Sequence, residues 1–150
     1  MAAFWEEYLR SLPEQDRDRR FFESFAFGTT PESSNHLAEL VMQGVKTATS
    51  ELLWSREGQA LWAVGDESIV VDGQGNPVCV LRTAELRVVP FAEVDAGFVR
   101  DYGEGERTLE WWRTEIWDHY RKECEALGRT PSEDMPLICE RFEIVYPRPA

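Results

Sequence analysis

The middle of the chain reads Ser68-Ile-Val-Val-Asp-Gly-Gln-Gly-Asn-Pro-Val-Cys-Val-Leu-Arg82. Two short runs rich in β-branched residues, 68–72 and 78–82, flank five residues that include two glycines, an asparagine and a proline. Glycine and asparagine tolerate the backbone angles of tight turns, so this stretch predicts a β-hairpin. The segment 85–90 is expected to continue the same sheet.

Helical patterns lie on both sides of this hairpin. On the N-terminal side they predict a short helix that ends at Pro13, a second helical stretch over about 16–27, and a helix from Thr30 to Gly44. On the C-terminal side a helical pattern follows Phe91, and the longest helix is expected over about 108–127. An alternating strand over 136–146 closes the chain. We therefore expect an α+β fold whose sheet closes into a small barrel.

Length and composition are typical of one folded domain. The chain has 150 residues, of which 43% are hydrophobic and 29% are charged. We expect a single domain over 1–150, with a helical N-terminal part at about 1–44 and the barrel and long helix at about 45–150. The N-terminus lacks the apolar run of a signal peptide, and the three cysteines form no CxxC pair. These features predict a cytoplasmic protein without a membrane partner.

The charge of the chain limits its partners. Aspartate and glutamate total 28 against 16 lysines and arginines, which gives a net charge of -12. Because such a chain repels phosphate backbones on average, long duplex DNA is excluded as a partner, whereas a local basic groove is not. Only two of the cations are lysines, Lys46 and Lys122.

The segment with the most chemical content is Leu40-Val-Met-Gln-Gly-Val-Lys-Thr-Ala-Thr-Ser50. Backbone amides near Gly44, the Lys46 cation and the hydroxyl groups that follow are groups that hold an oxyanion, a phosphate or a nucleobase edge. A lysine beside apolar residues has its pKa lowered by desolvation and can activate Thr49 as a nucleophile. The same residue types also suit an exposed lysine in a loop followed by β-forming threonines, so both interpretations stay open.

Two further groups of residues have a functional and a structural interpretation. Acidic residues near the start of the long helix either interact favourably with the helix dipole or supply an acid, a base or a metal ligand facing Lys46. These residues are Asp101, Glu104, Glu106 and Glu110. Among the tryptophans, Trp112 is expected in the core, whereas Trp54, beside Arg56 in a loop-like region, is a candidate for stacking on a base.

Ten short elements, in order along the chain, resemble the ASCH domain, in particular its bacterial branch of proteins of about 150 residues. They are Phe27-Gly28, 38–41, 44–49, Gly65-Asp66, Val78-Cys79, Pro90-Phe91, 103–105, Leu109, Trp112-Arg113 and Phe142. The resemblance implies a PUA-like fold, a small β-barrel flanked by helices, with Lys46 in a cleft. It also implies RNA binding, and in one group of the family an amidohydrolase that removes the acyl group from N4-acetylcytidine.

The amidohydrolase group uses a lysine, a threonine three residues later and a glutamate. The resemblance therefore implies that Lys46 is the base and Thr49 the nucleophile. Close relatives tend to read Glu-Gly-Glu-Gly-Asp where this chain has Tyr102-Gly-Glu-Gly-Glu106. If the catalytic carboxylate corresponds to the first position, it is a tyrosine here; if it corresponds to the second, it is Glu104.

We therefore expect recognition of a modified nucleoside or a short single-stranded RNA, with amide hydrolysis as the leading activity. The alternatives are an RNA-binding module or a single-strand ribonuclease that uses the same cleft, and a scaffold that binds a partner through its aromatic helix. No cofactor is expected, except magnesium or manganese in a ribonuclease, and the protein is expected to be a monomer or a homodimer. Candidate ligand-binding residues are Gly44, Thr47, Trp54, Arg56, Arg82 and Tyr102.

Overall fold

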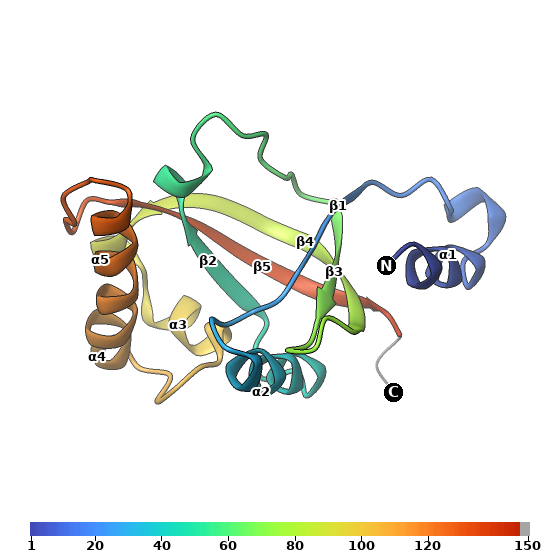
Figure 1. The fold of residues 1–150 in the computed structure, drawn as a ribbon, viewed down its shortest axis with the longest axis horizontal. Coiled ribbons are helices and arrows are strands. Elements are labelled where there is room, and N and C mark those ends of the chain that lie inside the picture. Colours follow the sequence, from blue (N-terminus) through green and yellow to red (C-terminus); the bar gives the residue numbers. More distant parts are fainter. Residues whose placement is uncertain (148–150) are drawn as a thin grey trace. The chain divides into compact units, whose positions relative to one another are not determined.

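The structure, a computed structural model, describes residues 1–147, and Figure 1 shows its helices and strands. The chain divides into two compact units. Unit 1 contains Met1–Val45, Trp62–Ala84 and, among the described residues, 142–147. Unit 2 contains Lys46–Leu61 and Glu85–Arg141. Each unit has its own buried apolar clusters. No helix in the described residues is both long enough and apolar enough to span a bilayer.

Unit 1 is built on the expected hairpin. β3 (Glu67–Val71) pairs in antiparallel fashion with the first part of β4 (Pro77–Pro90), and β4 continues through 85–90 as predicted. α1 (Ala2–Arg10) and α2 (Pro31–Met42) are also in the expected places. The side chain of Thr30 accepts a hydrogen bond from the Ser33 amide and caps α2, which explains where this helix begins.

The prediction of a helix over about 16–27 is wrong. The structure has a 3₁₀ turn at Glu14–Asp16 and then strand β1 (Phe21–Phe25), which pairs in parallel with β3. A short apolar run such as Phe21-Phe22-Glu-Ser-Phe25 has no clear helical or strand period, so its pairing partner decides its conformation. The N-terminal part of the chain is therefore only partly helical.

Unit 2 places a short strand beside a group of helices. β2 (Ala48–Leu52) pairs in antiparallel fashion with β5 (Pro136–Tyr146), with Ala48 opposite Arg141 and Leu52 opposite Leu137. After β4 come a 3₁₀ turn at Phe91–Glu93, α3 (Ala96–Tyr102), α4 (Leu109–Trp111) and α5 (Trp117–Ala126). Ala48 and Leu52 lie in the same buried cluster as aromatic residues of these helices.

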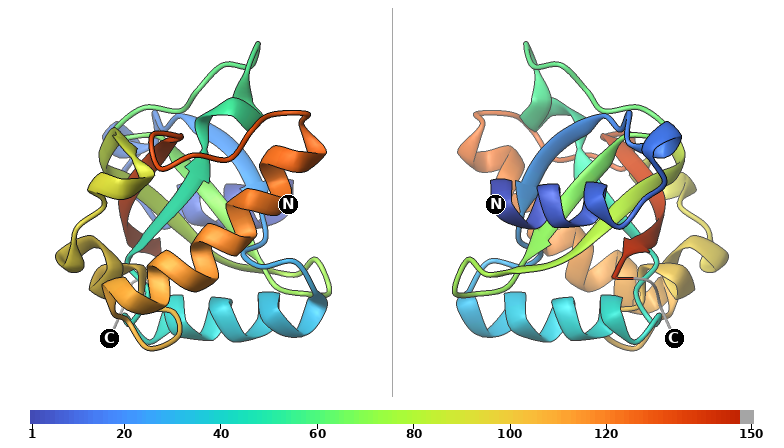
Figure 2. Two further views of the ribbon diagram at one scale, coloured as in Figure 1. Left: turned by 90° about the vertical axis from the view of Figure 1, so that its left-hand side faces the viewer. Right: turned by 90° about the vertical axis from the view of Figure 1, so that its right-hand side faces the viewer.

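The long helix contains a π-helical turn. Residues Trp112–Ile116 form this turn between α4 and α5, and Figure 2 shows the three segments as one continuous helix. The buried residues of the helix, Trp112, Ile116, Tyr120 and Cys124, recur every four positions. An α-helix has about 3.6 residues per turn, so such a spacing drifts around its axis. A wider π turn reduces this drift and keeps the four side chains on the core face.

The strands follow the hydrogen-bonded order β1-β3-β4-β5-β2, with parallel and antiparallel pairs. The fold is therefore α+β, as expected. In the described residues the sheet is not closed, so the expected small barrel is corrected to an open mixed sheet, because the order begins at β1 and ends at β2.

Candidate functional site

Lys46 is the most deeply buried charged side chain of unit 2. Its side chain has no exposed surface, and Nζ lies 2.7 Å from Glu104 Oε2. Nζ also donates to the main-chain oxygens of Ala48 at 2.9 Å and Tyr102 at 3.1 Å. An ammonium has three N–H donors, and each therefore has an acceptor here. The loop-surface interpretation of Lys46 is thus excluded.

The position of Lys46 follows from the end of α3. The last turn of a helix leaves carbonyl groups without intrahelical partners, and cations are stabilised there. The Lys46 ammonium takes the carbonyl of Tyr102, while the amide and the hydroxyl of Thr47 both donate to the carbonyl of Asp101. Residues 46 and 47 therefore cap α3 while they lead into β2.

Glu104 reaches Lys46 because the loop after α3 has a fixed shape. Gly103 ends the helix in the left-handed region at φ 73°. A Cβ atom at Gly105 would overlap the indole ring of Trp111, so this position accepts only glycine. Arg107 donates from Nε and Nη2 to the Arg100 carbonyl and holds the far end of the loop. The Glu104 side chain is 19% exposed, so solvent reaches the ion pair from the carboxylate side.

Burial controls the protonation of Lys46. Desolvation lowers the pKa of this amine below its ordinary value of 10.5, and the nearby Glu104 carboxylate opposes that decrease. The net effect is a lowered pKa, so the neutral amine forms at a pH closer to the physiological range. The ion pair is therefore a place where a proton can move between an amine and a carboxylate.

Tyr102 forms one wall of the site. Lys46 Nζ lies 3.6 Å from the centroid of its ring, a cation–π contact. The ring packs edge-on against Trp112 at 5.0 Å. Burial, followed by the negative charge of Glu104, raises the pKa of Tyr102 well above its usual range, while a hydrogen bond with Ser50 lowers it. With its pKa raised in this way, Tyr102 stays a neutral hydroxyl.

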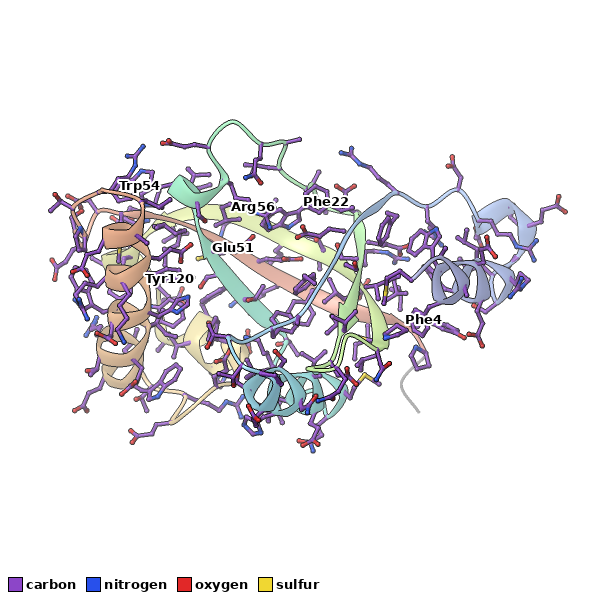
Figure 3. All side chains as sticks on the ribbon, viewed as in Figure 1. Phe4, Phe22, Glu51, Trp54, Arg56 and Tyr120 are labelled. Atoms are coloured by element: carbon purple, nitrogen blue, oxygen red, sulfur yellow. The ribbon has the colours of Figure 1, made fainter. Side chains whose placement is uncertain are left out.

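Two residues that the sequence analysis did not select belong to this site. Ser50 Oγ lies 2.6 Å from the hydroxyl oxygen of Tyr120, a buried residue of α5 (Figure 3). Alternation along β2 places Ser50 on the same face as Ala48 and Leu52, which are in the core of unit 2. That alternation was a usable signal for Ser50, whereas nothing in the sequence pairs Ser50 with Tyr120.

Thr49 lies in β2, opposite Glu140 of β5. Because strand side chains alternate, Thr49 and Glu51 share the face opposite to that of Ser50. The Thr49 side chain is half-buried and makes no hydrogen bond within the described residues. Its hydroxyl is therefore available to a ligand. Its assignment as the nucleophile stays a prediction.

The backbone amides that were expected to hold an oxyanion already donate hydrogen bonds to carbonyl groups of the protein. The amide of Gly44 donates to the Val41 carbonyl, and the amide of Val45 donates to the Leu40 carbonyl. The amide of Thr47 donates to Asp101, as described above. Gly44 has φ 75°, so its role in the structure is to end α2 in the left-handed conformation.

The other candidate ligand-binding residues have partners in the structure. Arg56, in the 3₁₀ turn Leu53–Arg56, contacts both carboxylate oxygens of Glu51, at 2.9 and 3.1 Å (Figure 3). Trp54 packs against the core of unit 2, and the Arg129 guanidinium stacks on it at 4.7 Å.

Arg82 belongs to unit 1. It lies 3.1 Å from Glu67, whose buried carboxylate also accepts the single hydroxyl proton of Tyr8, with the hydroxyl oxygen 2.9 Å from each carboxylate oxygen. Its charge is therefore balanced by a buried acid, and its role in ligand binding stays a prediction.

Of the acidic residues near the long helix, only Glu104 faces Lys46. Asp101 accepts a hydrogen bond from Arg141 Nε at 3.1 Å, and Glu106 and Glu110 are exposed. Within residues 1–147, no group of three or more histidine, cysteine or acidic side chains is arranged to hold a metal ion. The acid that faces the lysine is therefore Glu104, and its assignment as the catalytic carboxylate stays a prediction.

Sequence comparison assigns the chain to a family. The ASCH domain matches residues 23–146. The chain belongs to the ASCH domain family. The matching residues include the lysine, threonine and glutamate discussed above. No curated protein matches the chain.

Solved structures agree with this assignment. An ASCH domain from Lactobacillus crispatus JV V101 shares 28% sequence identity, with a TM-score of 0.90 over 97% of this chain and 93% of its own. A protein from Enterococcus faecalis V583 is also 28% identical, with a TM-score of 0.84 over 98% of this chain and 94% of its own. A hypothetical protein at 15% identity and a TM-score of 0.51, over 83% of this chain and 99% of its own, shares the fold alone. The α+β, PUA-like fold of this ASCH domain is thus confirmed.

Proposed function

We propose that this ASCH domain recognises a modified nucleoside or a short single-stranded RNA and hydrolyses the acyl amide of an N4-acetylcytidine-like base. The observation that carries the proposal is the buried ion pair of Lys46 and Glu104, 2.7 Å apart, with Thr49 three residues after the lysine. Burial lowers the pKa of Lys46, which favours its use as a base. The family assignment supports a nucleoside or RNA ligand.

In this proposal a proton first passes from Lys46 to Glu104 and leaves a neutral amine. The amine takes the hydroxyl proton of Thr49 as the Thr49 oxygen bonds to the acyl carbon. The C–N bond then breaks, and the leaving nitrogen takes the proton back from Lys46. Water then attacks the acyl–threonine ester while Lys46 takes its proton, and the Thr49 oxygen takes that proton from Lys46 as the ester C–O bond breaks. The carboxylic acid leaves, and Glu104 returns its proton to Lys46.

The test is hydrolysis of N4-acetylcytidine by the purified full chain, followed by chromatography of cytidine and acetate. We expect equal amounts of the two products. Thr49→Val and Glu104→Gln should each lower kcat by about 100-fold, because each removes one acid–base or nucleophilic group. Glu106→Gln changes an exposed acid in the same loop and should leave kcat unchanged. Absence of cytidine with the native protein would contradict the hydrolysis.

A second function, binding without hydrolysis, is favoured by one observation. All three N–H groups of Lys46 already have acceptors, so the lysine is stable as an ammonium that holds the surrounding backbone in place rather than as a base. In that case cytidine and N4-acetylcytidine should bind with similar affinity, as measured by calorimetry, and neither should be converted. Binding of neither nucleoside nor a short single-stranded RNA would contradict both functions.

A further inference from the structure

A buried acidic residue of β5 lies directly opposite Thr49. The register of the β2–β5 ladder pairs Thr49 with Glu140, and both residues belong to unit 2. Side chains that are directly opposite in an antiparallel pair point to the same face of the sheet, with their Cβ atoms about 5 Å apart. The Glu140 side chain therefore begins beside the Thr49 hydroxyl, across the ladder.

The buried cluster of unit 2 shows which face of the sheet this pair is on. Leu52 of β2 pairs with Leu137 of β5, and both belong to that cluster together with Cys139. Because side chains alternate along each strand, Thr49 and Glu140 point to the opposite face. The pair therefore lies outside the aromatic core that surrounds the helices of unit 2.

The face with Thr49 and Glu140 becomes more exposed toward β2. Glu140 is 6% exposed, Thr49 is half-buried, and the side chain of Glu51 is 36% exposed. β2 is the last strand in the sheet order of residues 1–147. A ligand that approaches from this side therefore meets the Thr49 hydroxyl first and the Glu140 carboxylate behind it.

The chemistry of the proposed reaction places one nitrogen of the ligand near both side chains. The Thr49 oxygen attacks the acyl carbon from about 3 Å, and that carbon is bonded directly to N4 of the base. N4 carries a hydrogen in N4-acetylcytidine and in cytidine. An ionised carboxylate only accepts hydrogen bonds, and a glutamate is a usual acceptor for the N4–H of cytosine. Uridine has an acceptor oxygen, O4, at the same position, and a carboxylate repels it.

We infer that Glu140 is the residue that selects cytosine-type bases, by accepting a hydrogen bond from N4–H while Thr49 faces the acyl carbon. The inference rests on the proposed function, because that function sets the position of N4. Glu140 has interactions within the protein, and its two carboxylate oxygens offer about four acceptor sites, so a ligand N–H can be added to them. Since Glu140 is almost fully buried, little water competes for this hydrogen bond.

The test is the affinity of the purified full chain for cytidine and for uridine, measured by calorimetry. The native protein should bind cytidine at least about 10-fold more tightly than uridine. Glu140→Gln keeps the size of the side chain but adds an N–H donor that can point at O4 of uridine. The variant should bind cytidine more weakly and uridine more tightly, so the ratio of the two affinities falls by about 10-fold. Equal affinities in the native protein, or a native ratio in the variant, would overturn the inference.

Glu51→Gln is the matched control. Glu51 carries the same charge on the same face, but it lies opposite Ile138 rather than Thr49. Its substitution should leave the ratio of the two affinities unchanged. Loss of folded protein weakens both affinities alike, so the ratio does not depend on the stability of either variant. A ratio that falls equally in both variants would assign base selection to the charge of the face as a whole and would overturn the role of Glu140.

The same measurements distinguish failure of the inference from failure of the proposed hydrolysis, which plays no part in the binding of cytidine or uridine. A preference for cytidine that depends on Glu140, in a protein that releases no cytidine from N4-acetylcytidine, would support base selection and contradict hydrolysis. Hydrolysis by a protein whose preference does not depend on Glu140 would overturn the inference alone. Binding of neither nucleoside would overturn it together with the nucleoside ligand.

Discussion

At the scale of single residues, Lys46 has two roles. It caps the end of α3 through the Tyr102 carbonyl, and it forms the buried half of the ion pair with Glu104. A cation fully removed from water is stable only when its partners replace the lost hydration. The same arrangement that holds the backbone together therefore brings an amine with a lowered pKa next to a carboxylate.

Replacing Lys46 by methionine should destabilise the protein. Lys46→Met keeps the length of the side chain but leaves Glu104 and two carbonyl groups without their donor. Removal of one partner from a buried ion pair costs about 3 kcal/mol in the free energy of unfolding. Urea unfolding measures this loss, and Lys122→Met, which changes the exposed lysine of α5, is the control with little effect. Equal stability of both variants would contradict the role of Lys46.

The stability that depends on Lys46 also changes with pH. Its pKa is lower in the folded chain than in the unfolded chain, so between these two values the unfolded chain binds the additional proton. Stability rises with pH wherever the unfolded state holds more protons. The contribution of Lys46 to the free energy of unfolding therefore increases as the pH rises toward 10.5, the ordinary pKa of lysine.

At the scale of elements, the loop between α3 and α4 decides whether Glu104 meets Lys46. Three of its residues have a left-handed backbone conformation, which favours glycine: Gly103 at φ 73°, Gly105 at φ 60° and Arg107 at φ 59°. Gly105 also packs against Trp111 so closely that no side chain fits. The sequence Gly103-Glu104-Gly105 thus gives the loop a shape that places the Glu104 carboxylate next to Lys46, just before β2.

Gly105→Ala should disrupt this loop, and Gly128→Ala is its matched control. Both glycines have positive φ, 60° and 71°, but a Cβ at Gly128 meets nothing within 4 Å. Gly128→Ala should cost about 1 kcal/mol, the ordinary penalty of a left-handed residue. Gly105→Ala should cost more, because it adds a steric overlap with Trp111, and it should also shift the Lys46 side-chain signal in the NMR spectrum of a protein labelled at lysine. Equal losses of stability in the two variants, measured by urea unfolding, would contradict the assigned packing.

Most elements of the fold were predictable from local patterns. The glycine-rich turn at 73–77, the Thr30-Pro31 helix start and the alternation over 136–146 all predict what the structure contains. β1 was not predictable in this way, since five residues with three phenylalanines fit a helix or a strand, and pairing with β3 decides between them. The open sheet likewise depends on long-range pairing rather than on any local pattern.

The site was predictable only in part. Lys46 stood out as one of two lysines followed by hydroxyl residues, and its burial beside Glu104 is confirmed. The sequence did not show that the backbone amides near Gly44 donate hydrogen bonds within the protein. These hydrogen bonds form at the end of α2 and depend on the geometry of the helix end, which the sequence does not give. Tyr120 looked like an ordinary core residue, and its contact with Ser50 joins positions 70 residues apart.

At the scale of the whole molecule, the net charge of -12 opposes binding of a long nucleic acid. The arginines expected to meet phosphates are paired with acids, Arg56 with Glu51 and Arg82 with Glu67. These two arginines are therefore less able to replace counterions along a nucleic acid. This favours a nucleoside or a few nucleotides over a long duplex.

Binding of a short single-stranded RNA should accordingly depend weakly on salt. Each phosphate contact contributes a slope of about -0.7 to a plot of log K against log salt concentration for single strands. Because the chain is acidic overall and Arg56 and Arg82 are paired with acids, we expect a slope smaller in magnitude than about 2, measured by fluorescence anisotropy. A duplex of the same length serves as the control and should not bind. A steep slope together with tight duplex binding would contradict the assignment of a small ligand.

The measurement that tests the central claim most directly is the titration of the two lysines by NMR. The side-chain signals of Lys46 and Lys122, observed in a protein labelled only at lysine, report the two amines separately. If Lys46 is the buried partner of Glu104, its midpoint lies below the ordinary 10.5, and Glu104→Gln moves it lower still, because the carboxylate opposes the effect of burial. A Lys46 midpoint at or above 10.5, or one that Glu104→Gln leaves unchanged, would contradict the site.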